Sequence, residues 1–283
     1  MTADTRVPPS RPALAALNTA LAFVRRDFLI AASYKTAFAA DALGIVFKVI
    51  TFYYIGAIFG GRVAPSPDSI GHDYFAFLLV GIALLDFVHT SLTTFSQSVR
   101  ESQMAGTLEV VLLSPIRLHG MVLYSSIWPY LFTTLRFATY IVMGVVLFDL
   151  PVAVSGIPAA MLVLGLTIVC FAPLGVISAA IIMVFKKGAW FPMLINGASF
   201  LLAGIAYPVE VLPAWAARAS YYLPLTHSVT GMREALLNGR AVSELGTELG
   251  FMLAFATVLM PVSLWMFELA VNRTRQLGTL TQY

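Results

Sequence analysis

The sequence has few charged residues. Asp, Glu, Lys and Arg make up only 11% of its 283 residues, whereas hydrophobic residues make up 59%. Soluble domains carry roughly 25% charged residues, and a soluble chain of this length has no other means of covering its surface. The shortage of charge therefore predicts a protein whose surface largely faces lipid. The net charge of +3 does not indicate nucleic-acid binding, because the positions of the charges matter more than their sum.

Other absences exclude several kinds of chemistry. Cys170 is the single cysteine, which excludes an intrachain disulfide and a thiolate metal site. The sequence contains no G-x-x-x-x-G-K-[ST] motif and no Gly-Lys pair, so the chain is not expected to hydrolyse nucleotide. Dinucleotide signatures, zinc-spaced His pairs and nucleophile elbows are also absent. We expect no metal or cofactor on this chain, and the few scattered polar residues disfavour an intramembrane enzyme.

Long hydrophobic stretches are what the sequence has in abundance. A transmembrane helix needs about 20 mainly apolar residues, and six segments qualify. They run from Thr36 to Phe59, Tyr74 to Val99, Met121 to Phe148, Pro158 to Phe185, Ala189 to Ala206, and Gly246 to Val271. The fifth is the shortest and ends at Tyr207-Pro208, where a helix must break.

Lys and Arg in the connections predict the orientation, since cytoplasmic loops carry an excess of them. With the N-terminus in the cytoplasm, eleven lie on the cytoplasmic side and four on the opposite side. The eleven are Arg6, Arg11, Arg25, Arg26, Lys35, Arg100, Arg117, Lys186, Lys187, Arg273 and Arg275, and the four are Arg62, Arg218, Arg233 and Arg240. We expect a multi-pass protein of a prokaryotic inner membrane with both termini in the cytoplasm.

Residues 1–35 and 272–283 are predicted to be cytoplasmic. Leu14, Leu17, Leu21 and Val24 recur at helical spacing, which predicts an amphipathic helix lying on the cytoplasmic membrane surface. A disordered tail is the alternative for this stretch. Residues 36–271 then form the transmembrane domain.

The loop after the second predicted span indicates a docking helix. Met104, Leu108, Val111 and Leu112 fall on one helical face, and Pro115 ends the helix. A short apolar helix in a cytoplasmic loop needs a cover, and a groove on a partner protein is one. An ordinary amphipathic turn at the membrane surface is the alternative.

The same loop carries a resemblance to a known family. Gly106-Thr107-Leu108-Glu109, followed by Leu113-Ser114-Pro115, resembles the intracellular loop of ABC-2 type permeases. A second match lies between the last two predicted spans, in Tyr207 to Trp215, Leu223 to His227, and Arg233 with Leu236 to Gly239. The order of these motifs is similar to that of the drug and lipo-oligosaccharide exporter branch.

This resemblance implies a permease driven by a separate ATPase. Residues 101–115 would form the coupling helix that docks on the ATPase, with these contact residues: Met104, Gly106, Thr107, Leu108, Glu109 and Leu112. The partners would be two ABC ATPase subunits, which bind the ATP and Mg, and a second permease chain, identical or paralogous. An outward direction of transport rests on the resemblance alone.

Ionisable residues within or at the ends of the predicted spans are costly and often functional. They include Lys48, Asp41, Asp86, His89, Arg136 and Glu268. Lys48, Asp86 and Arg136 lie at similar depth, roughly 18 to 22 Å from the cytoplasmic ends at 1.5 Å per residue. We expect Asp86 and Arg136 to pair, either as an ion pair that fixes helix packing or as a polar patch that contacts substrate. His89 is expected to be a hydrogen-bonded core residue, and Asp41 to reach water at the membrane boundary.

The stretch 207–240 is too polar to span and too apolar for a free loop. It contains three prolines, Pro208, Pro213 and Pro224, together with Tyr207, Leu212 and His227. We expect two short helices, near Pro213 to Tyr222 and Pro224 to Asn238, dipping into the outer leaflet. By resemblance this is a re-entrant element above the transport pathway, and a structural outer cap is the alternative.

The sequence thus predicts an all-α fold of six spans, an N-terminal interfacial helix, a coupling helix and a re-entrant pair. The predicted function is export of an amphipathic substrate, such as a drug, a lipid, a glycolipid or a polysaccharide, out of the cytoplasm or the inner leaflet. The alternative is an ion-coupled secondary transporter that uses Asp86, His89 and Arg136 as a proton relay. The absence of a clear internal repeat argues against it.

Overall fold

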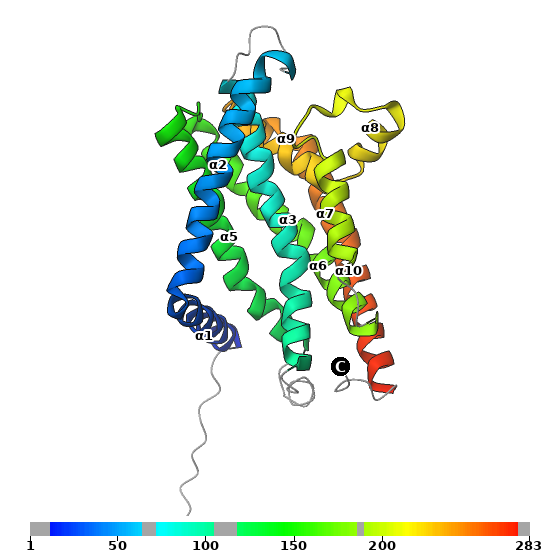
Figure 1. The fold of residues 1–283 in the computed structure, drawn as a ribbon. Helices are drawn as coiled ribbons and strands as arrows, with labels where there is room; N and C mark the ends of the chain where they lie inside the picture. The colour runs from blue at the N-terminus through cyan, green and yellow to red at the C-terminus, as the bar shows by residue number, and fades with distance from the viewer. Residues whose placement is uncertain (1–11, 64–71, 105–117, 186–189, 277–283) are drawn as a thin grey trace, which may run out of the picture.

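A computed structural model describes residues 12–63, 72–104, 118–185 and 190–276 (Figure 1). Within these ranges the regular structure is helical and contains no strand. The α-helices are α1 (Pro12–Ser33), α2 (Lys35–Val63), α3 (His72–Met104), α5 (Leu118–Phe148), α6 (Ile157–Phe185), α7 (Trp190–Leu202), α8 (Ala214–Tyr221), α9 (Pro224–Leu236) and α10 (Gly246–Gln276). Short 3-10 turns occupy Val154–Gly156, Val209–Val211 and Val242–Glu244.

Five helices are long and apolar enough to cross a membrane: α2, α3, α5, α6 and α10. Five of the predicted spans are thus confirmed as long apolar helices, with ends that differ by a few residues. The agreement follows from length and hydropathy, because a continuous apolar stretch in lipid must satisfy its backbone groups within one helix.

The fifth predicted segment is shorter than expected. It forms α7, a helix of 13 residues that ends at Leu202 rather than at Ala206. Gly204 adopts a positive φ of 69°, a conformation that breaks a right-handed helix and that glycine adopts without a steric penalty. At 1.5 Å per residue, α7 is roughly 20 Å long, less than the roughly 30 Å hydrocarbon core.

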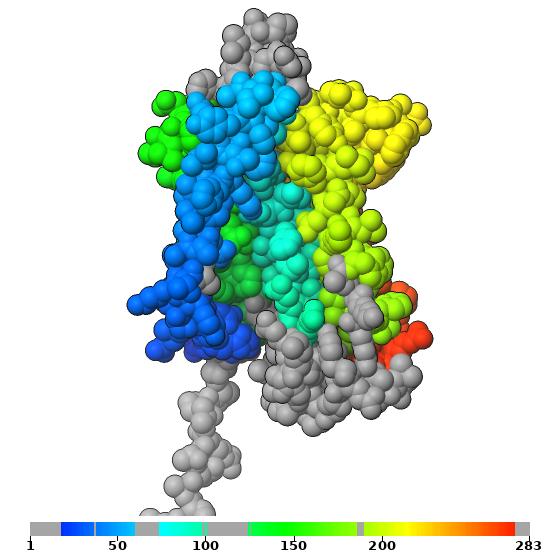
Figure 2. All heavy atoms as spheres, in the orientation of Figure 1, coloured from blue at the N-terminus to red at the C-terminus, as the bar shows by residue number. Residues whose placement is uncertain are grey.

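The core of the bundle is built around α3. In its membrane span 72% of the residues are buried, against 11% in α2. It contacts α2, α5, α6, α7 and α9, and part of it is visible between α2 and α7 in the space-filling view (Figure 2). Close packing with α6 depends on Gly175, where an added Cβ would lie 2.1 Å from the carbonyl oxygen of Ser91. The residues that form the sites described below are therefore mounted on, or packed against, the most buried helix.

The N-terminal helix α1 lies crosswise to α2, at the end of the bundle where α3 ends (Figure 1). Phe28 of α1 meets Trp128 of α5 edge to face, with ring centroids 5.5 Å apart. Leu21, Leu29 and Ile30 are exposed. A separate N-terminal helix is thus present as predicted, and its location on a membrane surface stays a prediction.

The segment after α7 contains the two predicted short helices. They are α8 and α9, and both follow a proline signal: Pro213 precedes α8, and Pro224 is the first residue of α9. Proline suits a helix start because its missing N–H has no intrahelical partner there. In Figure 1 both helices lie at the end of the bundle where α3 begins. Their depth in a membrane stays a prediction.

Candidate functional site

An ion-pair cluster, here called the Asp86 cluster, joins α2, α3 and α5. Lys48 Nζ lies 3.2 Å from Asp86 Oδ1, and the Tyr140 hydroxyl donates a hydrogen bond of 3.0 Å to Asp86 Oδ2. Arg136 lies between two carboxylates, with Nη1 4.0 Å from Asp86 Oδ2 and Nη2 3.5 Å from Asp41 Oδ2. Two cations and two carboxylates therefore balance within the spans.

This cluster refines the expectation of an Asp86–Arg136 pair. The two side chains do meet, but Asp86 lies closer to Lys48 and to Tyr140. Asp41 was expected to reach water at the membrane boundary; its side chain is 54% exposed, and its carboxylate also faces Arg136. The reason is spacing: Asp41 and Lys48 lie seven residues apart on α2, on nearly the same face. Both therefore turn toward α3 and α5, and the cluster ties the sparsely buried α2 to the core.

His89 does not join the Asp86 cluster. It was expected to be a hydrogen-bonded core residue, and this expectation is wrong: its side chain is exposed. One helical turn beyond Asp86, it points instead into a cavity of about 430 Å³. This cavity, here called the α7 cavity, lies between α3, α6 and α7, where α3 and α6 end and α7 begins. It is lined by His89, Thr93, Ser96, Gln97, Arg100, Ile182, Pro192, Met193 and Asn196.

The polar groups of the α7 cavity are only partly satisfied by the protein. The Thr93 hydroxyl donates to the His89 carbonyl at 2.7 Å, and the Ser96 hydroxyl donates to the Thr93 carbonyl at 2.9 Å. The Oδ1 atom of Asn196 is buried and has no hydrogen-bond partner within the described residues. Buried polar atoms in native proteins nearly always have partners, so this acceptor indicates a place for a donor from outside the chain.

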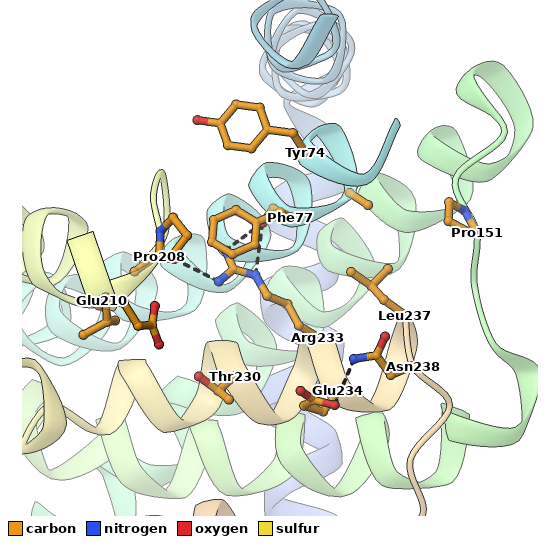
Figure 3. A pocket seen from close by; sticks show the side chains of 14 residues that line it. Tyr74, Phe77, Pro151, Pro208, Glu210, Thr230, Arg233, Glu234, Leu237 and Asn238 are labelled. Carbon is orange, nitrogen blue, oxygen red and sulfur yellow. Dashed lines mark hydrogen bonds between the residues drawn. The ribbon is translucent and has the colours of Figure 1, made fainter. Parts of the chain in front are cut away.

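A larger cavity, of about 580 Å³, lies at the opposite end of α3 (Figure 3). It is here called the α9 cavity, because α9 forms one wall. The start of α3, the turn after α7 and Pro151 form the others. Its lining comprises Tyr74, Ala76, Phe77, Pro151, Ala203, Gly204, Pro208, Val209, Glu210, Thr230, Arg233, Glu234, Leu237 and Asn238. Its volume falls within the range of small-molecule sites.

Arg233 is the cation of the α9 cavity, and backbone carbonyls hold it. Its guanidinium donates to the carbonyl of Phe77 at 2.7 and 3.2 Å, to Gly204 at 2.9 Å and to Ile205 at 3.1 Å. The same group lies 3.3 Å from the centroid of the Phe77 ring, as a cation–π contact. Burial lowers the pKa of Arg233 to about 9, which leaves it charged at neutral pH. Within the described residues it forms no ion pair with a carboxylate.

Gly81 makes room for this arrangement. A Cβ added at this position of α3 would lie 2.9 Å from Nη2 of Arg233 and 3.1 Å from the carbonyl oxygen of Ile205. Any larger side chain must therefore displace the guanidinium or the turn that it binds. Arg233 thus fastens α9 to α3 and to the end of α7, in a position that Gly81 keeps open.

The carboxylates of the α9 cavity lie nearer to solvent. Glu234 Oε2 accepts a hydrogen bond from Asn238 Nδ2 at 2.9 Å and pairs with Arg240 Nε at 3.0 Å. Glu210 is exposed and makes no ion pair with any residue that the structure describes. Glu210 is therefore the carboxylate of this lining that no described cation pairs with, whereas the buried cation Arg233 is engaged with carbonyls.

The residues predicted for the re-entrant element hold its turns. Pro208 precedes the Val209–Val211 turn, Leu212 follows it, and Pro213 precedes α8. The Tyr207 hydroxyl donates to the Leu201 carbonyl. His227 is buried, with Nε2 2.9 Å from the Tyr221 carbonyl oxygen and its ring stacked on Phe251 at 4.0 Å. Of these residues only Pro208 lines the α9 cavity, so the others are placed to shape the segment.

The predicted coupling helix lies outside the described residues, apart from its first positions. Met104 is the last residue of α3. The other predicted contact residues, Gly106, Thr107, Leu108, Glu109 and Leu112, fall in the stretch 105–117. Their role stays a prediction.

Several residues of these sites were missing from the predicted set, among them Tyr140, Asn196 and Arg233. Tyr140 follows Arg136 by one helical turn, a spacing that places both on one face of α5, so a signal was present. Arg233 belongs to the second motif of the resemblance but lies outside the predicted spans. Asn196 is one polar residue in an apolar helix, and nothing in the sequence separates it from a packing residue.

Apolar helices of this length, with ion pairs and polar cavities inside the bundle, define a multi-pass membrane protein with polar sites between its spans. Transport proteins have this build. Residues 20–237 match the family described as ABC-2 type transporter, which covers more than half of the chain. The protein belongs to this family and is the membrane-spanning permease type of ABC transporter subunit.

Two relatives extend the comparison. Nodulation protein J of Rhizobium leguminosarum bv. trifolii is 27% identical over 223 residues, covering 77% of this chain and 80% of the relative. Nodulation protein J of Sinorhizobium fredii (strain NBRC 101917 / NGR234) is 28% identical over 232 residues, covering 77% of this chain and 81% of the relative. The similarity therefore extends over most of both chains.

Proposed function

We propose that this chain is the permease subunit of an ATP-driven exporter in a prokaryotic inner membrane. A separate ABC ATPase hydrolyses ATP, and the permease moves an amphipathic substrate, such as a drug, a lipid or a glycolipid, out of the cytoplasm or the inner leaflet. The family match carries this proposal, because members of the family work with ABC ATPase subunits. Both cavities lie along α3, so the polar part of a substrate has somewhere to reside at either end of the bundle.

In the proposed topology α7 is a sixth crossing. It begins at the end of the bundle where α6 ends, and the segment after it reaches the α9 end (Figure 1). Since α7 is too short to cross alone, the turn at 203–208 and the helices α8 and α9 complete this crossing. Six crossings place both termini on one side, which the distribution of Lys and Arg predicts to be the cytoplasm.

The proposed coupling element is the stretch 101–115, directly after α3. A force on this stretch acts on the most buried helix of the bundle and so reaches both cavities. Two ATPase subunits and a second permease chain, identical or paralogous, would complete the transporter. Outward transport follows the resemblance to the exporter branch.

The experiment that tests this function is affinity purification of the chain from native membranes, with an ATPase assay on the co-purified proteins. An ABC ATPase should co-purify, and Glu109→Lys should abolish its stimulation by the permease. Glu244→Lys is the matched control, because it makes the same charge change in an exposed turn at the opposite end, outside the lining of both cavities. A purification without any ATPase, together with transport that collapses when the proton gradient is removed, would instead support the ion-coupled alternative.

A further inference from the structure

We propose that one exposed face of α2 binds a zwitterionic headgroup of the phosphate–ammonium type. This face, here called the α2 face, consists of Phe38, Asp41, Gly44 and Lys48, which recur at helical spacing on one side of the helix. The inference rests on the proposed function, because it assigns a chemical class to the polar part of the transported amphiphile. Three observations carry it: a charge exposed at mid-membrane depth, the order of the charges along α2, and the open space at Gly44.

Lys48 exposes a charge at a depth where a bilayer contains no water. It lies ten residues into the apolar span Phe38–Phe59, roughly 15 Å from the start of that span at 1.5 Å per residue. This is about the middle of a hydrocarbon core of about 30 Å. The side chain is half-exposed, and Asp86 holds its Nζ at 3.2 Å, so it does not extend to the membrane surface. Charge in contact with acyl chains is costly, and a polar group from outside the described residues is therefore needed to cover it.

The charges at this face are balanced, which disfavours a ligand with a net charge. Lys48 and Arg136 are compensated by Asp86 and Asp41. An anion would be repelled by the carboxylates, and a cation by the ammonium and the guanidinium. A ligand with one charge of each sign is attracted to both halves of the cluster and leaves it neutral.

The spare hydrogen-bonding capacity of the cluster is on the donor side. Arg136 Nε is buried and has no hydrogen-bond partner within the described residues. The Lys48 ammonium carries three N–H donors, and the hydrogen bonds that the structure shows for it go to one carboxylate, that of Asp86. Oxygens of a phosphate group therefore add acceptors that the cluster lacks.

The order of the charges along α2 matches that of an inner-leaflet lipid. Asp41 is half-exposed and lies near the start of α2, seven residues or roughly 10 Å before Lys48. In a phosphate–ammonium head the phosphate is joined to the apolar part, and the ammonium is the outer group, nearer to water. The ammonium therefore meets Asp41 and the exposed ring of Phe38, an aromatic face suited to a cation. The phosphate meets Lys48, deeper in the membrane.

Gly44 leaves room for the head between these two charges. A Cβ added at Gly44 would have no heavy atom within 4 Å, so the surface of α2 is open at this point. Phe47, next to Lys48, is exposed and offers an apolar contact for the chain of the ligand. The α2 face thus provides a place for each part of an amphiphile.

A second copy of the chain fits the α2 face less well. In a parallel pair of identical chains about an axis normal to the membrane, identical residues lie at the same depth. Pairing through the α2 face would bring Lys48 toward Lys48 and Asp41 toward Asp41, so like charges would meet. A lipid-type head offers the opposite charge at each of the two depths, and is the occupant that the charges favour.

Binding to the purified full-length chain in a non-ionic detergent, measured by native mass spectrometry, tests the inference. The probes share a dodecyl chain and differ in their heads: dodecylphosphocholine, dodecyl sulfobetaine, dodecyl phosphate and dodecyltrimethylammonium. The sulfobetaine is the decisive comparison, because its ammonium is next to the chain and its anionic group is outermost, the reverse of phosphocholine. Dodecylphosphocholine should bind about tenfold more tightly than the other three, since one misplaced hydrogen bond to a charged group costs roughly that factor.

Two variants locate the binding. Gly44→Leu fills the open space without a change of charge, and should lower the affinity for dodecylphosphocholine about tenfold. Gly165→Leu on α6 is its matched control and should bind like the wild type, because nothing lies within 4 Å of a Cβ there either. Asp41→Asn removes the partner of the ammonium, so the affinity for dodecylphosphocholine should fall while that for dodecyl phosphate does not. Glu244→Gln, which changes an exposed carboxylate outside the α2 face, is the control for this variant.

Equal affinity of the wild type for dodecylphosphocholine and the sulfobetaine, or a Gly44→Leu variant that binds dodecylphosphocholine normally, would overturn the inference. If Gly44→Leu also converted a dimer to a monomer in the mass spectrum while this binding persisted, the α2 face would belong to a second copy. The assay needs no ATPase. A chain that selects phosphocholine but supports no ATP-driven transport would therefore contradict the proposed function alone, and the reverse result would contradict this inference alone.

Discussion

The two cavities at the ends of α3 each contain an arginine, and the surroundings of the two arginines differ. In the α9 cavity, Arg233 is buried against three carbonyl groups and the Phe77 ring. In the α7 cavity, Arg100 lines a polar space with an unpartnered amide oxygen at Asn196. In the first cavity the cation therefore links helices, and the second presents one amide oxygen, Asn196 Oδ1, that the described chain does not satisfy.

This difference shows how a polar residue with a structural role can be distinguished from one that binds a ligand in an apolar bundle. A buried cation whose N–H groups are taken up by backbone oxygens has little left for a ligand. Its removal should unfold the protein rather than change its selectivity. An acceptor left open beside polar side chains has the opposite signature: its removal should cost little stability and impair binding.

The largest effect is expected for Arg233→Leu. The change leaves the carbonyls of Gly204 and Ile205 without this donor and removes the link between α9 and α3. We expect a loss of roughly 3 to 5 kcal/mol, the range for breaking a buried charged network, and a fall in Tm of about 10 °C, measured by thermal unfolding in detergent. Arg240→Gln, in an exposed pair, is the control and should cost no more than about 1 kcal/mol. Equal losses of stability for the two variants would show that Arg233 contributes no more to the fold than an exposed ion pair does.

A second prediction concerns the Asp86 cluster, which lies between the cavities. Asp86→Asn leaves Lys48 and Arg136 without their shared carboxylate, and should destabilise the fold by about 2 kcal/mol. This is below the cost for a fully buried pair, because the Lys48 side chain is 46% exposed and solvent screens it. The exchange Asp86→Arg with Arg136→Asp should restore part of the stability. Restored stability without restored transport would show that the cluster also serves the pathway.

The third prediction concerns the space around Arg233. Gly81→Ala should cost about 1 to 3 kcal/mol by overpacking, since the new Cβ would lie 2.9 Å from Nη2 of Arg233. Gly165→Ala on α6 is the matched control, because nothing lies within 4 Å of a Cβ there. It should be neutral or stabilising by up to about 1 kcal/mol. An unchanged Tm of the Gly81→Ala variant would show that the Arg233 guanidinium can shift to make room for the Cβ despite its hydrogen bonds.

The smallest effect on stability is expected for Asn196→Leu. Replacing an amide with an unpartnered oxygen by an apolar group of similar size should change stability by less than about 1 kcal/mol, measured by Tm. Transport should nevertheless fall, because the cavity loses its open hydrogen-bond acceptor. A fall in Tm comparable with that of Arg233→Leu would place Asn196 among the structural residues and erase the contrast between the cavities.

Much of the fold was predictable, and the contacts were predictable only in part. Long apolar stretches predicted α2, α3, α5, α6 and α10, because in lipid a stretch of that kind has hardly any alternative to a helix. The length of α7 was wrong, since hydropathy continues past Leu202 while the backbone turns at Gly204. Helical depth predicted that Asp86 and Arg136 would meet.

Depth alone did not predict the neighbours of these charges. Lys48 and Tyr140 lie closer to Asp86 than Arg136 does, because the rotation of each helix about its axis decides which side chains face each other. The same rotation turns His89 away from Asp86 and into the α7 cavity, although only three residues separate them.

The sequence by itself determined the membrane class of this protein, its helical fold and its family, since these depend on composition, on the length of apolar stretches and on local motifs. The tertiary structure alone decided what each polar residue does. Arg233 and Arg100 are the same side chain in the sequence, and only the packing of α9 against α3, and of α7 beside it, places one against three backbone carbonyls and the other in the lining of a cavity. The physical reason is that the cost of a buried charge is set by the groups around it, and those groups come from distant parts of the chain.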